Sequence, residues 1–298
     1  MTSNPSEVAA RSSRNIGLAC LLVTSVGWGL NWSVMKFLLG EWPPLFARGI
    51  SGITAALALA ALARTRGEDL AVPRSALARL AACAFFNVFV WMGFSTLSLR
   101  WLSAGQGAML VYTMPVWTML IAWPVLGKRP RPGGVAGVVL AVAGVAALFG
   151  GAASELGVGQ WPGTMFALLA AALFALGTVA VRPVPLPPFT QIAWQLAIGC
   201  APMLAFGVLF EKPDLGALSR TGVAAMAYMT TFAMGICYLT WFAAVRRLAA
   251  TTASMGTLIT PVVGVVSGSL MLGEALGPRQ WLALALVIAG VALALRER

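Results

Sequence analysis

The sequence lacks histidine altogether and contains only nine acidic residues among 298. Charged residues make up 10% of the chain, whereas a soluble domain carries about 25%. A chain with so little charge and 59% hydrophobic residues cannot solvate its own surface in water. Together with a mean hydropathy of +0.87, this composition predicts an integral membrane protein that contacts the lipid bilayer.

The same absences restrict the chemistry of the chain. The four cysteines show no CxxC spacing and have no histidine companion, so neither a metal site nor a cofactor is expected. An enzyme needs a nucleophile–base pair or a metal centre. The sequence has no histidine and no pair of acids within an apolar run, so we do not expect an enzyme.

The net charge of +11 reflects membrane topology and not nucleic-acid binding, because the cations lie in short loops between apolar runs. Of the 20 Lys and Arg residues, 14 fall on the same side of the predicted membrane as the N-terminus. The remaining six are Lys36, Arg48, Arg100, Lys212, Arg220 and Arg279. Because cytoplasmic loops carry the excess of Lys and Arg, both termini are predicted to be cytoplasmic.

Ten apolar runs are long enough, or nearly so, for the roughly 20 residues that span a bilayer. They cover 16–38, 45–63, 76–98, 102–123, 133–150, 161–181, 190–210, 221–245, 251–271 and 280–295. Residues 1–15 are predicted to form a cytoplasmic tail. The first run is too long for the core of a signal peptide and has no clean cleavage site, so we expect it to be retained as a spanning helix.

The second half of the chain repeats the first after a shift of 146 residues, so that Arg100 meets Arg246 and Pro115 meets Pro261. We therefore predict two five-helix repeats, at 16–150 and 161–298. An odd number of helices per copy forces the second copy to enter the membrane upside down. Inverted repeats are typical of secondary transporters that work by alternating access; a duplicated structural bundle is the alternative interpretation.

Three short motifs carry a family resemblance. They are Gly27 to Asn31 followed by Lys36, Tyr112 to Pro115 followed by Leu126 to Lys128, and Thr260-Pro261 followed by Met271 to Glu274. In this order, over the whole chain, they resemble the EamA-type carriers of the drug/metabolite transporter superfamily, and most of all the bacterial aromatic amino-acid exporters.

That resemblance implies an all-α protein of ten transmembrane helices around a central cavity in the bacterial inner membrane. It also implies that the small-molecule substrates are aromatic and other neutral amino acids, which the protein would export. An exporter of another small neutral metabolite or drug is the alternative. Small-residue spacings such as Gly133xxxGly137 indicate close helix packing and do not require an oligomer.

Polar and aromatic residues fall on common faces of several predicted helices, with helical spacing at bilayer depth. We expect them to line the substrate cavity, although polar contacts between packed helices are the alternative interpretation. The expected cavity residues are Trp28, Asn31, Asn87, Trp91, Tyr112, Thr178, Tyr228, Thr231, Tyr238 and Thr257.

None of the nine acids lies in the middle third of a predicted helix. A proton-coupled carrier needs a titratable group at membrane depth, so facilitated diffusion without proton coupling is expected. The cavity is expected to be neutral, with Lys36 and Arg182 as the only candidate cations, both near helix ends. Pro115 and Pro261 occupy equivalent positions, each frees a backbone carbonyl, and together they are predicted to act as a pair of hinges.

Overall fold

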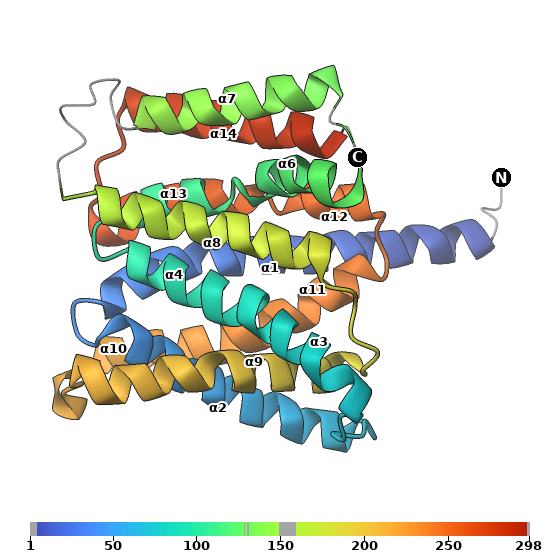
Figure 1. The fold of residues 1–298 in the computed structure, drawn as a ribbon, viewed down its shortest axis with the longest axis vertical. Helices are drawn as coiled ribbons and strands as arrows, with labels where there is room; N and C mark the ends of the chain where they lie inside the picture. The colour runs from blue at the N-terminus through green and yellow to red at the C-terminus, as the bar shows by residue number, and fades with distance from the viewer. Residues whose placement is uncertain (1–4, 128, 130, 149–158, 297–298) are drawn as a thin grey trace.

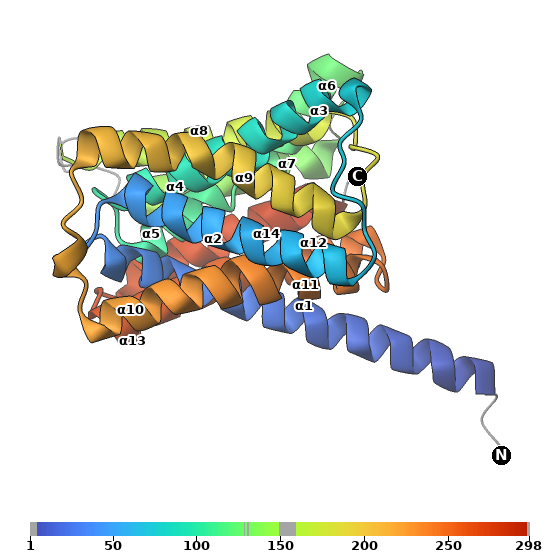
Figure 2. The ribbon, with the colours of Figure 1, turned by 90° about the horizontal axis from the view of Figure 1, so that it is seen from below.

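The computed structural model describes residues 5–127, 129, 131–148 and 159–296, and these residues form a bundle of helices without strands (Figures 1 and 2). The first half contains α1 (Pro5–Leu38), α2 (Pro44–Thr65), α3 (Arg74–Ala84), η1 (Phe85–Val90), α4 (Trp91–Ser98), α5 (Ala104–Val111), α6 (Met114–Leu126) and α7 (Pro132–Leu148). The second half contains α8 (Trp161–Ala180), α9 (Pro188–Phe206), η2 (Gly207–Glu211), η3 (Leu215–Ala217), α10 (Arg220–Ala227), η4 (Tyr228–Ile236), α11 (Cys237–Val245), α12 (Ala250–Gly256), α13 (Ile259–Leu272) and α14 (Pro278–Arg296).

Within the described residues, eight helical segments are long and apolar enough to cross a membrane. Two shorter apolar helices, Pro132–Ala147 and Ile259–Leu272, lie in the positions of the fifth and ninth predicted spans. The protein is therefore multi-pass. The helix α1 begins at Pro5 and so extends into the stretch predicted as a tail (Figure 1).

Two of the apolar helical segments break just before a proline. The first break separates α5 from α6 at Tyr112 and Thr113, and the second separates α12 from α13 at Thr257 and Leu258. A proline removes a backbone donor and clashes with the carbonyl four residues earlier, so the helix is interrupted at equivalent points of the two halves.

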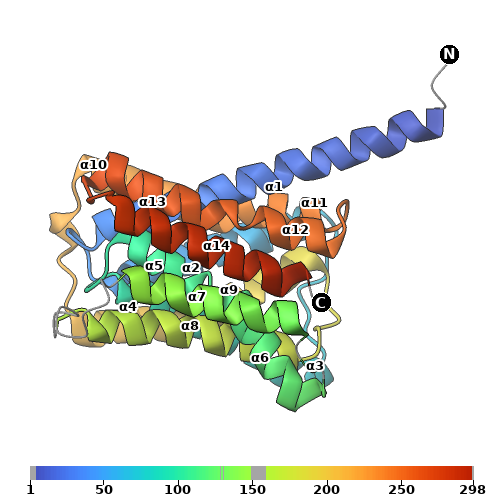
Figure 3. The ribbon, with the colours of Figure 1, turned by 90° about the horizontal axis from the view of Figure 1, so that it is seen from above.

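Helices that correspond under the 146-residue shift run antiparallel where they pack together. In the pair α7 and α14, a Cβ added to Gly137 would lie 2.6 Å from the carbonyl oxygen of Gly290, and one added to Gly144 would lie 2.9 Å from that of Ala283. The two helices therefore run in opposite directions, and their backbones are in close contact (Figures 1 and 3).

The pair α2 and α9 is also antiparallel, and a carboxylate closes each of its ends. Glu68 accepts a hydrogen bond from the backbone N–H of Thr190 at 2.9 Å, at the start of α9. Glu211 accepts one from the N–H of Phe46 at 2.8 Å, at the start of α2. The first turn of a helix has unpaired N–H groups and a partial positive charge, so each carboxylate joins one half of the chain to the other.

Two more carboxylates make the same kind of contact between the halves. Glu274, which follows α13, accepts a hydrogen bond from the N–H of Gly105 at 3.2 Å in the first turn of α5. Glu41, which follows α1, accepts hydrogen bonds from the N–H and hydroxyl of Ser219 at 3.0 and 2.6 Å before α10. Both contacts lie at the end of the bundle opposite to the chain termini (Figure 2).

We expect Gly290→Ala to lower the melting temperature of the purified protein by several degrees. The added methyl group would lie 2.5 Å from the carbonyl oxygen of Gly137 and 2.6 Å from the nitrogen of Ala141, and overpacking of this kind costs about 1–3 kcal/mol. Thermal unfolding in detergent measures the effect. The matched control is Gly235→Ala, whose nearest neighbour would be Thr230 at 3.8 Å; equal losses in both variants would contradict this close packing.

Candidate functional site

A cavity of about 430 Å³ lies in the centre of the bundle, between the two halves. Its walls come from α1, η1, α4, α6, α8, α9, α11 and α14, and from the two breaks that separate α5 from α6 and α12 from α13. The lining residues are Trp28, Asn87, Val88, Trp91, Tyr112, Met114, Pro115, Thr118, Phe174, Thr178, Gln191, Ile192, Gln195, Leu196, Tyr238, Trp241, Phe242, Thr257 and Leu295.

The cavity reaches the end of the bundle where both termini lie. Its lining includes Thr178 in the last turn of α8, Gln191 in the first turn of α9 and Leu295 in the last turn of α14. These three helix ends lie at the end of the bundle that carries the C-terminus (Figures 1 and 3).

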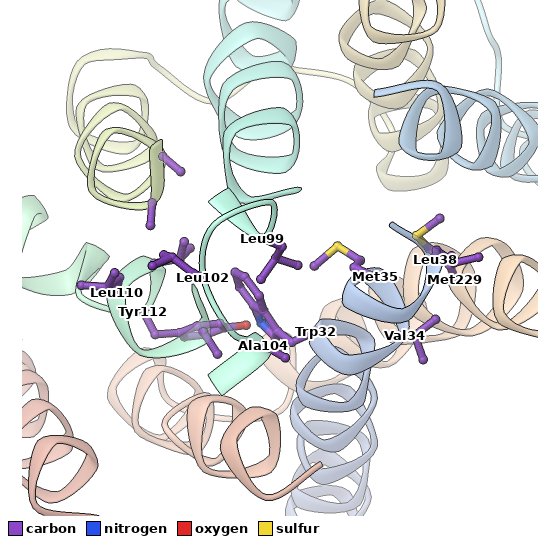
Figure 4. Close-up of a cluster of buried hydrophobic side chains, with 14 residues drawn as sticks. Trp32, Val34, Met35, Leu38, Leu99, Leu102, Ala104, Leu110, Tyr112 and Met229 are labelled. Atoms are coloured by element: carbon purple, nitrogen blue, oxygen red, sulfur yellow. The ribbon is translucent and has the colours of Figure 1, made fainter. Parts of the chain in front are cut away.

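The opposite end of the bundle is filled by buried side chains. Trp32, Met35 and Leu38 of α1 pack there against Leu99 and Leu102 from the connection between α4 and α5 (Figure 4). All five are 4% exposed or less. Three of the carboxylate contacts between the halves lie at this end, and they are made by Glu41 after α1, Glu211 at the end of η2 and Glu274 after α13. The structure is therefore closed at one end and open at the other.

Aromatic rings form much of the cavity wall. The indole of Trp28 lies 5.5 Å from the ring of Tyr238 and 5.9 Å from that of Trp241, and Trp91 lies 5.9 Å from Phe174. The Trp28 indole also donates a hydrogen bond to the carbonyl oxygen of Ala233 at 3.0 Å, which holds its ring in place. Faces of this kind suit flat or apolar groups.

The polar groups of the cavity wall are amides and hydroxyls. Asn87 donates a hydrogen bond to Gln195 at 3.4 Å, which joins η1 to α9 across the boundary between the halves. The hydroxyl of Thr178 donates to the carbonyl oxygen of Phe174 in its own helix. Among the described residues, no Asp or Glu side chain lines the cavity.

The expectation of a neutral site is wrong at the inner end. A second, smaller space of about 20 Å³ lies beyond the main cavity, and Arg48 of α2 lines it. Arg48 is only 3% exposed, so it is a buried cation, whereas the topology count placed it among the cations on the membrane side opposite the N-terminus. The sequence placed it in the first turns of an apolar run, and only the packing shows where its side chain lies.

Seven of the ten predicted cavity residues line the main cavity, and Asn31 lines the smaller space. The other two lie elsewhere. The hydroxyl of Tyr228 donates to the carbonyl oxygen of Gly27 at 2.8 Å and so joins η4 to α1. Thr231 is exposed and bonds within its own helix to Ala227. Of the two predicted hinge prolines, Pro115 lines the cavity and Pro261 is buried in α13.

Sequence reasoning missed the contribution of α9. Gln191 and Gln195 line the cavity from that helix, and Gln195 is only 9% exposed. Two amides spaced four residues apart in an apolar run lie on one helix face. This spacing indicates that both side chains face the interior of the bundle. Trp241 was also missed, although it continues the aromatic series of α11.

A multi-pass helical protein with two like halves, and with a polar and aromatic cavity between them that is open at one end, has the features of a small-molecule membrane transporter. Comparison with known proteins specifies the class further. The chain belongs to the EamA-like transporter family, whose model matches it twice, over residues 15–150 and 161–296.

Several relatives cover most of the chain. It is 28% identical to the uncharacterized transporter YvbV of Bacillus subtilis, over 89% of this chain and 87% of the relative. It is 27% identical to the inner membrane transporter YedA of Escherichia coli, over 89% and 86%. It is also 27% identical to a probable amino-acid metabolite efflux pump of Salmonella typhimurium, over 94% of each chain. Among solved structures, one example matches with a TM-score of 0.66 at 20% identity, over 95% of this chain and 96% of that one, which shows the fold alone.

We expect Thr178→Cys and Thr118→Cys, made in a variant without the native cysteines, to react with a charged thiol reagent applied from the side where a C-terminal tag is accessible. Both positions line the cavity that opens there. Reaction from the other side should be much slower, because buried side chains fill that end. The control is Ser98→Cys, whose position is fully buried at the closed end. Equal labelling from both sides would contradict a one-sided opening.

Proposed function

We propose that this transporter exports neutral amino acids, aromatic ones among them, by facilitated diffusion. The observation that carries the proposal is the central cavity of about 430 Å³, which lies in the range of about 300–1,000 Å³ typical of small-molecule sites. Its aromatic wall suits an apolar side chain, and its amides and hydroxyls suit a polar head group. The relative in Salmonella typhimurium that is named a probable amino-acid metabolite efflux pump supports the same substrate class.

We infer that the ten apolar segments span the membrane as two inverted repeats that alternate access to the cavity. The antiparallel packing of corresponding helices, α2 with α9 and α7 with α14, supports an axis that lies in the membrane plane. The excess of cations on the side of the termini supports a cytoplasmic position for the open mouth. The protein would then face inward, in the inner membrane of a bacterium.

The proposal of uncoupled transport is supported by the position of the acids. Glu41, Glu68, Glu211 and Glu274 all bind backbone N–H groups at helix starts. A carboxylate held in this way stabilises helix ends and has no contact with the cavity. Transport would then follow the substrate gradient alone.

The broken helices offer the flexible points that alternating access needs. The breaks before Pro115 and Pro261 lie at equivalent positions, and the first of them forms part of the cavity wall. Bending at both points would move α6 and α13 relative to α5 and α12, and so change the width of the cavity mouth.

A second candidate is export of another small neutral metabolite or drug. The observation in its favour is the aromatic wall formed by Trp28, Trp241 and Phe242, because such faces bind flat ligands of many kinds. An assay that offers several ligand classes to the same protein separates the two candidates.

The purified protein in liposomes should catalyse counterflow of labelled L-tryptophan, with competition by L-phenylalanine and L-methionine. Sugar phosphates, which have no apolar side chain for the aromatic wall, and cationic dyes, which would meet the charge of Arg48, should not compete. Flux should be unchanged when an ionophore collapses an imposed pH gradient. Dye efflux without amino-acid flux would favour the second candidate, and flux that depends on the pH gradient would contradict uncoupled transport.

We expect Pro115→Ala combined with Pro261→Ala to slow counterflow at least several-fold while substrate affinity stays close to that of the wild type. Alanine restores the missing backbone donor and favours a continuous helix, which would stiffen both breaks. Each single variant serves as a control for the symmetric role of the pair. A double variant that transports at the wild-type rate would rule out the hinges.

A further inference from the structure

Arg48 is a buried cation without a partner among the described residues. Its side chain is 3% exposed, and its Nε and Nη1 atoms make no hydrogen bond. The titratable groups that interact with it electrostatically are Cys200 and Tyr238, and neither is a carboxyl group. A guanidinium has five N–H donors and stays charged in proteins, so this group is left with a charge and with donors that no residue in the described part of the chain satisfies.

Two further unpaired polar atoms line the same small space. The Nε1 atom of Trp91 is a buried donor without an acceptor, and the Oδ1 atom of Asn31 is a buried acceptor without a donor. Both side chains line the space of about 20 Å³ together with Arg48. The three residues come from α4, α1 and α2, so three separate helices direct unsatisfied groups to one place.

Three unsatisfied buried polar groups, one of them charged, raise the free energy of the folded protein unless a ligand binds to them. A single charge at bilayer depth costs several kcal/mol, and charged residues within spanning helices are usually paired or lie on a substrate pathway. The small space has room for about one water molecule, which could bond some of these atoms but would leave the charge of Arg48 uncompensated.

The donors and the acceptor match the head group of an α-amino acid. A carboxylate accepts hydrogen bonds, which suits the guanidinium of Arg48 and the indole N–H of Trp91. An ammonium group donates hydrogen bonds, which suits the side-chain oxygen of Asn31. We propose that Arg48, Trp91 and Asn31 form a head-group subsite, in which Arg48 and Trp91 bind the carboxylate of the transported molecule and Asn31 binds its ammonium group.

The subsite adjoins the main cavity. Trp28, Trp91, Tyr112 and Tyr238 line both spaces, so a ligand in the main cavity contacts the wall of the subsite. A carboxylate is larger than the smaller space, and these aromatic side chains must turn for it to enter. The amino-acid side chain would then remain among the rings of the main cavity.

The subsite has no equivalent in the second half of the chain. The 146-residue shift places Trp194 where Arg48 stands and Gly177 where Asn31 stands, and Trp194 is 39% exposed. The head-group subsite is therefore present in the first half of the chain and not in the second, and we expect one ligand to bind per chain.

This inference rests on the proposed function, and calorimetry on the purified full-length protein separates the two. The ligands are L-tryptophan and L-methionine, their amides, which lack the carboxylate, and 3-indolepropionate, which lacks the ammonium group. Each modified ligand should bind the wild type about 10- to 100-fold more weakly than its parent, as expected for loss of hydrogen bonds that involve charged groups. R48Q should lose a similar factor for the amino acids and should no longer distinguish an acid from its amide.

The thermal stability of the unliganded protein separates ligand binding from a structural role. R48Q removes an uncompensated buried charge, so its melting temperature should equal or exceed that of the wild type. R48K keeps a charge without the planar fork and should bind amino acids with intermediate affinity. Arg100→Gln, an exposed cation at the closed end, is the matched control and should bind like the wild type.

The outcomes are distinct. Equal affinity of R48Q and the wild type for L-tryptophan, or equal affinity of the wild type for acid and amide, would overturn the subsite and leave the transport proposal intact. Arg48-dependent binding without any amino-acid flux in liposomes would support the subsite and overturn the transport proposal. If the wild type neither binds nor moves amino acids, both proposals fall. If R48Q does not fold, the comparison of acid with amide on the wild type still decides the question.

Discussion

Within a bilayer no water is present to satisfy polar groups, so every backbone and side-chain polar atom needs a partner inside the protein. The starts of α2, α5, α9 and α10 meet this requirement with carboxylates from the other half of the chain. Hydroxyl pairs such as Ser33 with Ser267, at 2.7 Å, do the same between α1 and α13. The groups that satisfy helix ends are thus also the groups that hold the two halves together.

The carboxylate contacts between the halves are unevenly distributed over the two ends of the bundle, in line with the opening of the cavity at one end only. Three of the four carboxylate contacts lie at the end where the side chains around Trp32 and Leu99 are closely packed, and one, from Glu68, lies at the open end. The end with fewer of these carboxylate contacts is the end where the cavity opens. Polar atoms of Arg48, Asn31 and Trp91 have no such partner among the described residues, and these atoms are available to bind a ligand.

Most of the cavity could be predicted from helical spacing, because Trp28, Asn87 and Trp91 lie on faces that turn inward. The same reasoning failed for Tyr228 and Thr231, since a helix in a bundle has neighbours on more than one side and a polar stripe can face any of them. Tyr228 faces α1. Arg48 was misplaced for a related reason, because a cation near the end of an apolar run has the same sequence pattern whether it reaches the interface or points into the core.

The sequence alone determined that the protein lies in a bilayer, that its two halves are duplicates and where its helices break. These features depend on composition, on the repeat at a shift of 146 residues and on proline chemistry, and all three can be read from the sequence without knowing which residues are in contact. Only the tertiary structure decided which end of the cavity is open, which acids join the two halves and where the unpaired cation lies. Those features depend on contacts between residues far apart in the chain, such as Glu274 with Gly105, and no local pattern specifies which distant group will be the partner.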